Sequence, residues 1–130
     1  MLVYLVRHAE AAAGEPDALR ALTSSGVRQA RALGERLAAE KETPASVRTS
    51  PLLRARQTGE AIARAVGIAS EPDDRLAPGA TAGEARAVAA GCTAPVVLVA
   101  HQPDCSRIAA ELGGGPEPAF PPAGVVRLDL

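Results

Sequence analysis

Short apolar runs mark the expected strands of this chain. Met1–Val6 and Pro95–Ala100 are continuous apolar runs, the pattern of strands that are buried on both faces of a sheet. Ser46–Thr49 is a shorter strand candidate, and a further short strand is expected near Ile68–Ser70. Val125–Leu130 alternates apolar and polar residues, which favours a final strand near an edge of the sheet.

Apolar residues that recur every three to four positions predict helices between these strands. The four segments are Ser24–Lys41, Ser50–Val66, Ala82–Ala90 and Pro103–Leu112. The first helix is capped by Thr23 or Ser24. Its inward face is expected to consist of Val27, Ala30, Leu33 and Leu37. In the second helix, Ser50 and Pro51 suit the cap and the first helical position, and Gly67 suits its end.

The alternation of strands and helices predicts an α/β fold, a three-layer sandwich in which helices flank a mainly parallel central sheet. A chain of 130 residues suits one compact domain over residues 1–130. In such a sheet, sites form beyond the carboxyl ends of the strands. Side chains that follow a predicted strand are therefore the first candidates for function.

Composition and charge narrow the classes of function. The chain is 47% apolar with a formal net charge of −1, so no bulk electrostatic field favours nucleic acid or a membrane surface. The apolar start of the chain ends at Arg7, too early for a signal peptide, and no apolar stretch has membrane-spanning length. We expect a cytoplasmic protein in which Cys92 and Cys105 are reduced and act as small buried hydrophobes.

The chain has only two histidines, and both follow predicted buried strands. His8 comes after the first strand and Arg7, and His101 directly follows Pro95–Ala100. If these strands are neighbours in the sheet, both imidazoles reach one cleft at its carboxyl edge. The alternative is that each histidine is an incidental loop or capping residue, which the placement of both at strand ends disfavours.

Three arginines are candidates for the same cleft. Arg7 directly follows the first predicted strand, and Arg20 lies in the first loop. Arg54 is one turn into the second predicted helix, where side chains lean back toward the helix start and thus toward the carboxyl edge of the sheet. The alternative for Arg54 is a surface salt bridge with a residue such as Glu60 or Asp17.

Three guanidinium groups beside two imidazoles favour an anionic ligand. A phosphate ester carries a charge of about −1.5 to −2 near neutral pH. Arginine binds phosphate oxygens in bidentate fashion and stays protonated. A divalent metal ion fits poorly, because two histidines among cations, without a set of cysteines or carboxylates, would repel it. The residues therefore predict a phosphoryl site with no metal and no cofactor.

Four motifs, in order along the chain, resemble those of the histidine phosphatase superfamily, which includes the cofactor-dependent phosphoglycerate mutases. Residues 7–10 (RHAE) look like its RH signature, and residues 22–30 (LTSSGVRQA) are similar to its LTxxGxxQA element. Residues 50–58 (SPLLRARQT) match its SPxxRxxQT element, and residues 99–103 (VAHQP) resemble its second-histidine element. In length, and in having Arg20 before the LTxxG element, the chain most resembles the short SixA-type phosphohistidine phosphatases.

The resemblance implies a phosphoglycerate mutase-like fold and a metal-independent phosphatase. His8 would attack phosphorus and become phosphohistidine, which water would then hydrolyse. Arg7, Arg54 and His101 would hold the phosphoryl oxygens and stabilise developing charge, with Arg20 as a further substrate-binding residue. The implied substrate is phosphohistidine on a protein, as in signal transduction, and the implied assembly is a monomer or a weak dimer.

One part of the family pattern has no clear match. Many branches carry a glutamate that protonates the leaving oxygen, and the corresponding region here offers only Glu84, which we interpret as a surface helix residue. Glu10 and Asp104 are no better candidates. An alkoxide leaving group needs a general acid, whereas imidazole leaves more readily, so this absence favours phosphohistidine. Two alternatives stay open: a small-molecule phosphomonoesterase with Glu84 or a nearby Asp as acid, and a catalytically weak phosphoprotein-binding module.

Overall fold

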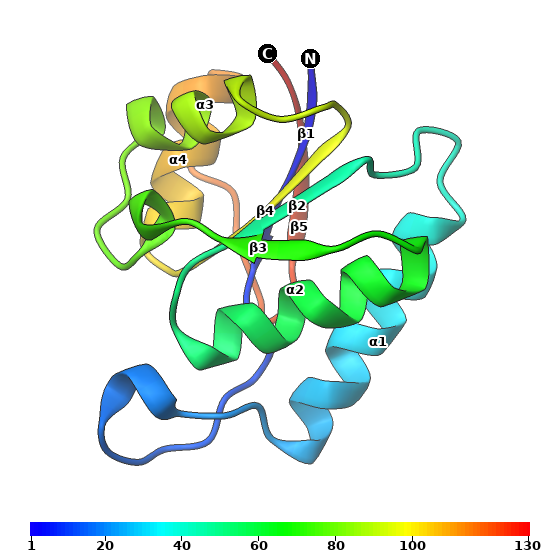
Figure 1. Cartoon of the computed structure of the whole chain (residues 1–130). Helices are drawn as coiled ribbons and strands as arrows, with labels where there is room; N and C mark the ends of the chain where they lie inside the picture. The colour runs from blue at the N-terminus through cyan, green and yellow to red at the C-terminus, as the bar shows by residue number, and fades with distance from the viewer.

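A five-stranded sheet runs through the centre of the computed structural model, which describes residues 1–130 (Figure 1). Its strands are β1 (Leu2–Arg7), β2 (Ser46–Thr49), β3 (Ser70–Pro72), β4 (Val96–Ala100) and β5 (Val125–Asp129). They lie in the order β3-β2-β4-β1-β5, and every pair is parallel except β1 and β5. The predicted mainly parallel sheet is confirmed, with β3 two residues later than expected.

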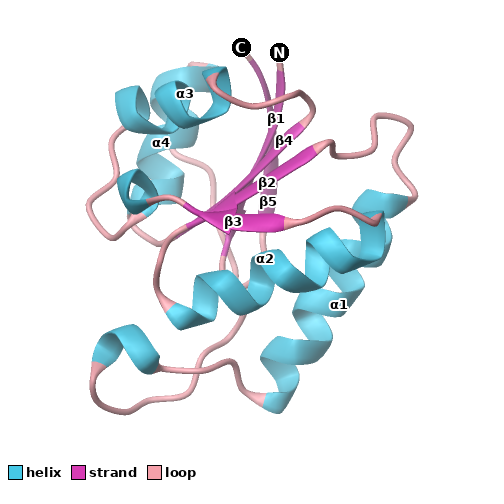
Figure 2. Ribbon diagram, viewed as in Figure 1, coloured by secondary structure: helices cyan, strands magenta, loops and turns pink.

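Two pairs of helices cover the two faces of this sheet (Figure 2). α1 (Ser24–Ala38) and α2 (Leu53–Val66) pack on one face, and α3 (Ala82–Ala90) and α4 (Asp104–Gly113) pack on the other. Two short 3₁₀ helices, η1 (Asp17–Leu19) and η2 (Asp74–Leu76), lie in the connections. The predicted three-layer sandwich is thus confirmed. None of the helices combines the length and the apolar character that a membrane crossing requires.

The side chains of β1 alternate between two hydrophobic cores. Val3 and Leu5 belong to the core beneath α3 and α4. Leu2, Tyr4 and Val6 belong to the core beneath α1 and α2. Because successive side chains of a strand point to opposite faces, a strand between two helical layers must be apolar along its buried length, which in β1 ends before Arg7. Each fully buried Val or Leu contributes about 1.5–3 kcal/mol, which explains why the uninterrupted runs marked the central strands reliably.

The second helix begins later than its sequence indicates. α2 starts at Leu53, and Leu52 at the cap position makes no side-chain capping bond. Ser50 Oγ accepts the N–H of Leu52 at 3.2 Å and also contacts a histidine ring. Ser50 and Pro51 therefore precede the helix rather than open it, because a tertiary contact engages the hydroxyl that local sequence assigned to capping.

The first helix is shorter than expected, and three of the four residues predicted for its inward face, Ala30, Leu33 and Leu37, are buried. α1 ends at Ala38 rather than Lys41, and Val27 is 44% exposed rather than buried. At the start of the helix Gly26 is buried in place of Val27, and it packs so tightly against the Glu10 carbonyl that a Cβ atom would not fit there. This close contact between helix and first loop turns Val27 toward the surface.

The topology brings the ends of β1 and β4 to one place. These strands are parallel neighbours, with Arg7 opposite Ala100 in the register. The residues that follow them, His8 and His101, therefore leave the sheet at the same edge. β2 ends on the other side of β4, where the N–H of Ser50 donates to the carbonyl of Val99 at 2.9 Å.

Candidate active site

The two histidine rings lie together at the carboxyl edge of the sheet. Their centroids are 5.2 Å apart, with an angle of 56° between the ring planes. His8 is half-buried, and His101 is only 4% exposed. The two imidazoles that the sequence placed at strand ends thus occupy one site.

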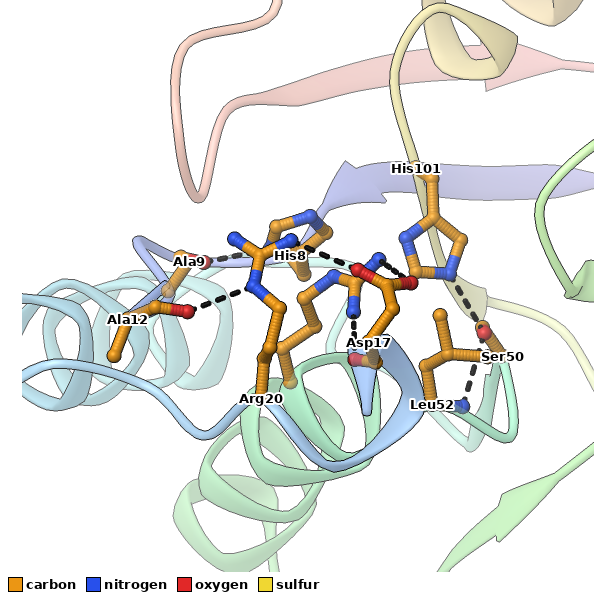
Figure 3. A network of polar contacts seen from close by, with 9 residues as sticks. His8, Ala9, Ala12, Asp17, Arg20, Ser50, Leu52 and His101 are labelled. Carbon is orange, nitrogen blue, oxygen red and sulfur yellow. Dashed lines mark hydrogen bonds and ion pairs between the residues drawn. The ribbon is translucent and has the colours of Figure 1, made fainter. Parts of the chain in front are cut away.

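His8 is oriented so that one ring nitrogen is free. Its Nδ1 lies 2.6 Å from the Ala9 carbonyl oxygen (Figure 3). Because a carbonyl can only accept, Nδ1 carries the proton and Nε2 of the neutral ring carries the lone pair. Burial lowers the pKa of His8; the Ala9 carbonyl opposes this, and the charges of Arg54, Arg7 and Arg20 reinforce it. A neutral imidazole with a free Nε2 can act as a nucleophile.

Arg54 is buried at the start of α2 and is paired with a carboxylate. Its Nη1 donates to the backbone carbonyl of Asp17 at 2.9 Å, and its Nη2 lies 3.2 Å from Asp17 Oδ2. The salt bridge with Asp17 that was the alternative explanation for Arg54 is therefore present. Arg54 is nevertheless part of the site: its charge acts on both imidazoles and lowers the pKa of His8 and that of His101.

Arg20 and Arg7 are each held by a backbone carbonyl. Arg20 Nε donates to the carbonyl of Ala12 at 2.7 Å, and its Nη1 lies 3.0 Å from Asp17 Oδ1. Arg7 Nη1 donates to the carbonyl of Phe120 at 2.9 Å, whereas its buried Nε has no partner. The structure therefore gathers all three sequence-selected arginines close enough to His8 to influence its pKa.

Ser50 is a site residue that sequence reasoning assigned to helix capping. Its Oγ lies 2.7 Å from His101 Nε2 and accepts the N–H of Leu52, so its own proton is available to Nε2 (Figure 3). In that arrangement the proton of the His101 ring resides on Nδ1, which is buried and has no partner. Such an unpaired donor suits a phosphoryl oxygen. The signal for Ser50 was its position directly after β2, the same strand-end position that selected the histidines.

The candidate acids are engaged elsewhere. Glu84 caps its own helix: its carboxylate accepts the N–H of Thr81 at 3.1 Å, and its N–H donates to Thr81 Oγ1 in return. Asp104 is buried against Arg107 and the backbone of the turn before α3. Glu10 accepts the hydroxyl proton of a neighbouring threonine. None of these carboxylates contacts either histidine, and Glu84 lies where the interpretation as a surface helix residue placed it.

No cluster of three or more His, Cys, Asp or Glu side chains with the geometry of a metal site is present. Cys92 and Cys105 are free thiols, the first half-buried and the second buried. Burial raises the pKa of Cys105 to about 12, so this thiol stays protonated at neutral pH. Neither cysteine takes part in the histidine and arginine site.

The burial of His101 predicts that the folded protein loses stability in mild acid. Burial, then His8 and Arg54, lower the pKa of His101 to about 4, whereas the unfolded chain titrates near its ordinary value of 6.5. The neutral His101 ring therefore contributes to the free energy of unfolding above pH 6.5, and this contribution is lost as the pH falls toward 4. We expect the free energy of unfolding to fall by on the order of 2 kcal/mol between about pH 7 and pH 4.5.

Chemical denaturation of wild type and His101→Gln at several pH values checks this prediction. The variant should show a clearly smaller pH dependence in that window. Asp17 and Asp73, whose pKa values are lowered by hydrogen bonds with arginines, lose their contribution only below about pH 4, so they do not confuse the result. Equal pH dependence in both proteins would contradict the prediction.

The amino-acid sequence of this chain is similar to those of known proteins. The family model of the histidine phosphatase superfamily, branch 1, matches residues 3–78. The phosphohistidine phosphatase SixA of Escherichia coli K12 is 30% identical over 125 residues, covering 91% of this chain and 78% of SixA.

Solved structures resemble this chain over nearly its whole length. A structure of the protein histidine phosphatase SixA complexed with tungstate superposes with a TM-score of 0.89 at 28% identity, covering 100% of this chain and 88% of that one. A mycobacterial glucosyl-3-phosphoglycerate phosphatase superposes with a TM-score of 0.76 at 20% identity, covering 97% of this chain and 88% of that one, a likeness of fold alone.

Proposed function

This chain belongs to the histidine phosphatase superfamily, and within it we propose that the protein hydrolyses phosphohistidine on another protein. The observation that carries the proposal is the free Nε2 of His8, set beside a second histidine and three arginines. The similarity to SixA, a phosphohistidine phosphatase, supports the choice of substrate.

The reaction proceeds in two phosphoryl transfers. His8 Nε2 attacks phosphorus, the bond from phosphorus to the substrate's imidazole nitrogen breaks, and that nitrogen takes a proton from solvent. Water then attacks phospho-His8, which releases inorganic phosphate and restores the neutral ring. Arg7, Arg20 and Arg54 bind the phosphoryl oxygens, and His101 Nδ1 donates a hydrogen bond to one of them. No step requires a metal ion or a cofactor.

The engaged carboxylates favour a phosphoramidate over a phosphate ester. Release of an alkoxide requires a proton donor near the leaving oxygen. Glu84 is committed to the capping box of α3 and Asp104 to an ion pair with Arg107. Imidazole is a much better leaving group than an alkoxide, so phosphohistidine can react without an acid from the protein. The competing small-molecule phosphomonoesterase would need one of these side chains to leave its present partners, or would need Asp17 to carry a proton, although hydrogen bonds from Arg20 and Arg54 hold its pKa below the ordinary value.

A substrate panel separates the two enzymes. We expect purified protein, with a chelator present, to hydrolyse phosphohistidine on a protein far faster than sugar phosphates. Glu84→Gln should leave this rate within about twofold, because surface substitutions away from a site have small effects. Glu111→Gln, an exposed carboxylate of α4, is the matched control.

Three results would decide against parts of the proposal. Rapid hydrolysis of esters that collapses in Glu84→Gln, but not in Glu111→Gln, would favour the phosphomonoesterase. Loss of all activity in the chelator would contradict metal independence. Phosphoprotein binding with no turnover of any substrate would favour the binding module.

A further inference from the structure

The loop between β1 and α1 places a carboxylate inside the arginine cluster. The two oxygens of Asp17 each face a different arginine: Oδ2 lies 3.2 Å from Arg54 Nη2, and Oδ1 lies 3.0 Å from Arg20 Nη1. Figure 3 shows this carboxylate in the space between Arg20 and His101. Both arginines are ones that the proposed function assigns to the phosphoryl group.

A carboxylate and a phosphoryl group compete for the same kind of donor. Guanidinium groups bind both anions through paired N–H groups, at similar distances. The hydrogen bond from Arg20, and then that from Arg54, hold the pKa of Asp17 below its ordinary value, so its carboxylate is ionised at neutral pH. Asp17 therefore presents an anion to the guanidinium groups that would bind the substrate.

We propose, on the basis of the phosphatase function above, that Asp17 is an internal anion that a phosphoryl group displaces on binding. In the substrate-free protein its carboxylate neutralises Arg20 and Arg54. When the phosphoryl group binds, its oxygens take over the N–H groups of these arginines and the carboxylate turns away.

The surroundings of Asp17 suit such an exchange. Its side chain is 60% exposed and reaches the arginines from a surface loop, so it can turn into solvent. The arginines keep other supports: Arg20 Nε is bound to the carbonyl of Ala12, and Arg54 Nη1 is bound to the backbone of Asp17. Displacing the side chain therefore leaves both guanidinium groups in position. It also makes Asp17 a determinant of affinity, because every bound phosphoryl group must break two ion pairs.

The size of the effect follows from the exposure of the carboxylate. Exposed ion pairs are individually weak, and two of them together correspond to about a three- to tenfold change in affinity. We expect Asp17→Asn and Asp17→Ala to bind tungstate and inorganic phosphate about three- to tenfold more tightly than wild type. Calorimetric titration, together with product inhibition by phosphate, measures this directly.

Glu15→Gln is the matched control. Glu15 is an exposed carboxylate of the same loop with no ion-pair partner, so its substitution removes the same charge without touching either arginine. We expect its affinity for both anions to stay within twofold of wild type. Melting curves of all three variants establish that the fold is retained, and two different residues at position 17 guard against an effect of one side chain.

The outcomes distinguish this inference from the function on which it rests. Tighter binding in both Asp17 variants, with Glu15→Gln unchanged, supports displacement. Unchanged or weaker binding in the Asp17 variants overturns it, because the carboxylate would then be neutral to the anion or needed to position the arginines. Equal tightening in Glu15→Gln also overturns it in favour of a general charge effect. If wild type binds neither anion and hydrolyses no phosphorylated substrate, the phosphatase function itself fails.

Discussion

Replacing His8 with alanine is expected to abolish both turnover and the covalent intermediate. In the proposed mechanism this side chain supplies the atom that attacks phosphorus, so its loss should lower kcat by at least about a thousandfold. The fold should survive, because the ring is half-buried and its one hydrogen bond is to the carbonyl of Ala9. Labelled substrate, quenched in alkali during turnover, should leave acid-labile phosphate on wild type and none on His8→Ala.

His101→Ala provides the comparison. His101 is assigned to a phosphoryl oxygen and not to phosphorus, so this variant should be slow but should still accumulate labelled protein. Mass spectrometry of wild type should place the phosphate on the peptide that contains His8. A phosphate on His101 instead, or full activity in His8→Ala, would show that the wrong histidine has been assigned as nucleophile.

The layered fold was predictable because the central strands are buried on both faces, which restricts them to apolar residues. β1 and β4 lie between two layers of helices, so their buried positions must be apolar on both faces, and such continuous runs can be recognised in the sequence alone. Which residues of a helix are buried was less predictable. Whether Val27 is buried depends on how closely Gly26 approaches the first loop, and that distance is a property of the packed structure.

Some residues of the candidate site were likewise predictable from the sequence, and others were not. His8 and His101 were identifiable because each follows a buried strand, and the sheet rule converts that position into a shared edge. Ser50 was assigned to a helix cap because Ser-Pro favours one locally, and only the neighbouring β4 gives its hydroxyl a histidine as partner. The place of Asp17 depends on the path of a loop, for which no periodic pattern exists. Its pairing with Arg54 was foreseen only as a surface contact.

Substituting Arg54 is expected to have the second largest effect on catalysis. An arginine that stabilises charge on a transferring phosphoryl group contributes on the order of a thousandfold or more, so Arg54→Ala should lose about that much in kcat/KM. Arg54→Lys keeps the charge but has one donor nitrogen where the guanidinium group of arginine has three. Because Nη1 and Nη2 of Arg54 make separate contacts, we expect the lysine variant to remain about ten- to a hundredfold below wild type.

The matched control is Arg64→Lys, in the last turn of the same helix, where the side chain is exposed and has no ion-pair partner. Its kcat/KM and its free energy of unfolding should stay near those of wild type. The lysine variant at position 54 should also bind inorganic phosphate more weakly, which ties the loss of rate to the anion and not to the fold. Wild-type kcat/KM in Arg54→Lys would mean that charge alone suffices there. Wild-type kcat/KM in Arg54→Ala would instead leave this guanidinium with a purely structural role, bound to Asp17 and not to substrate.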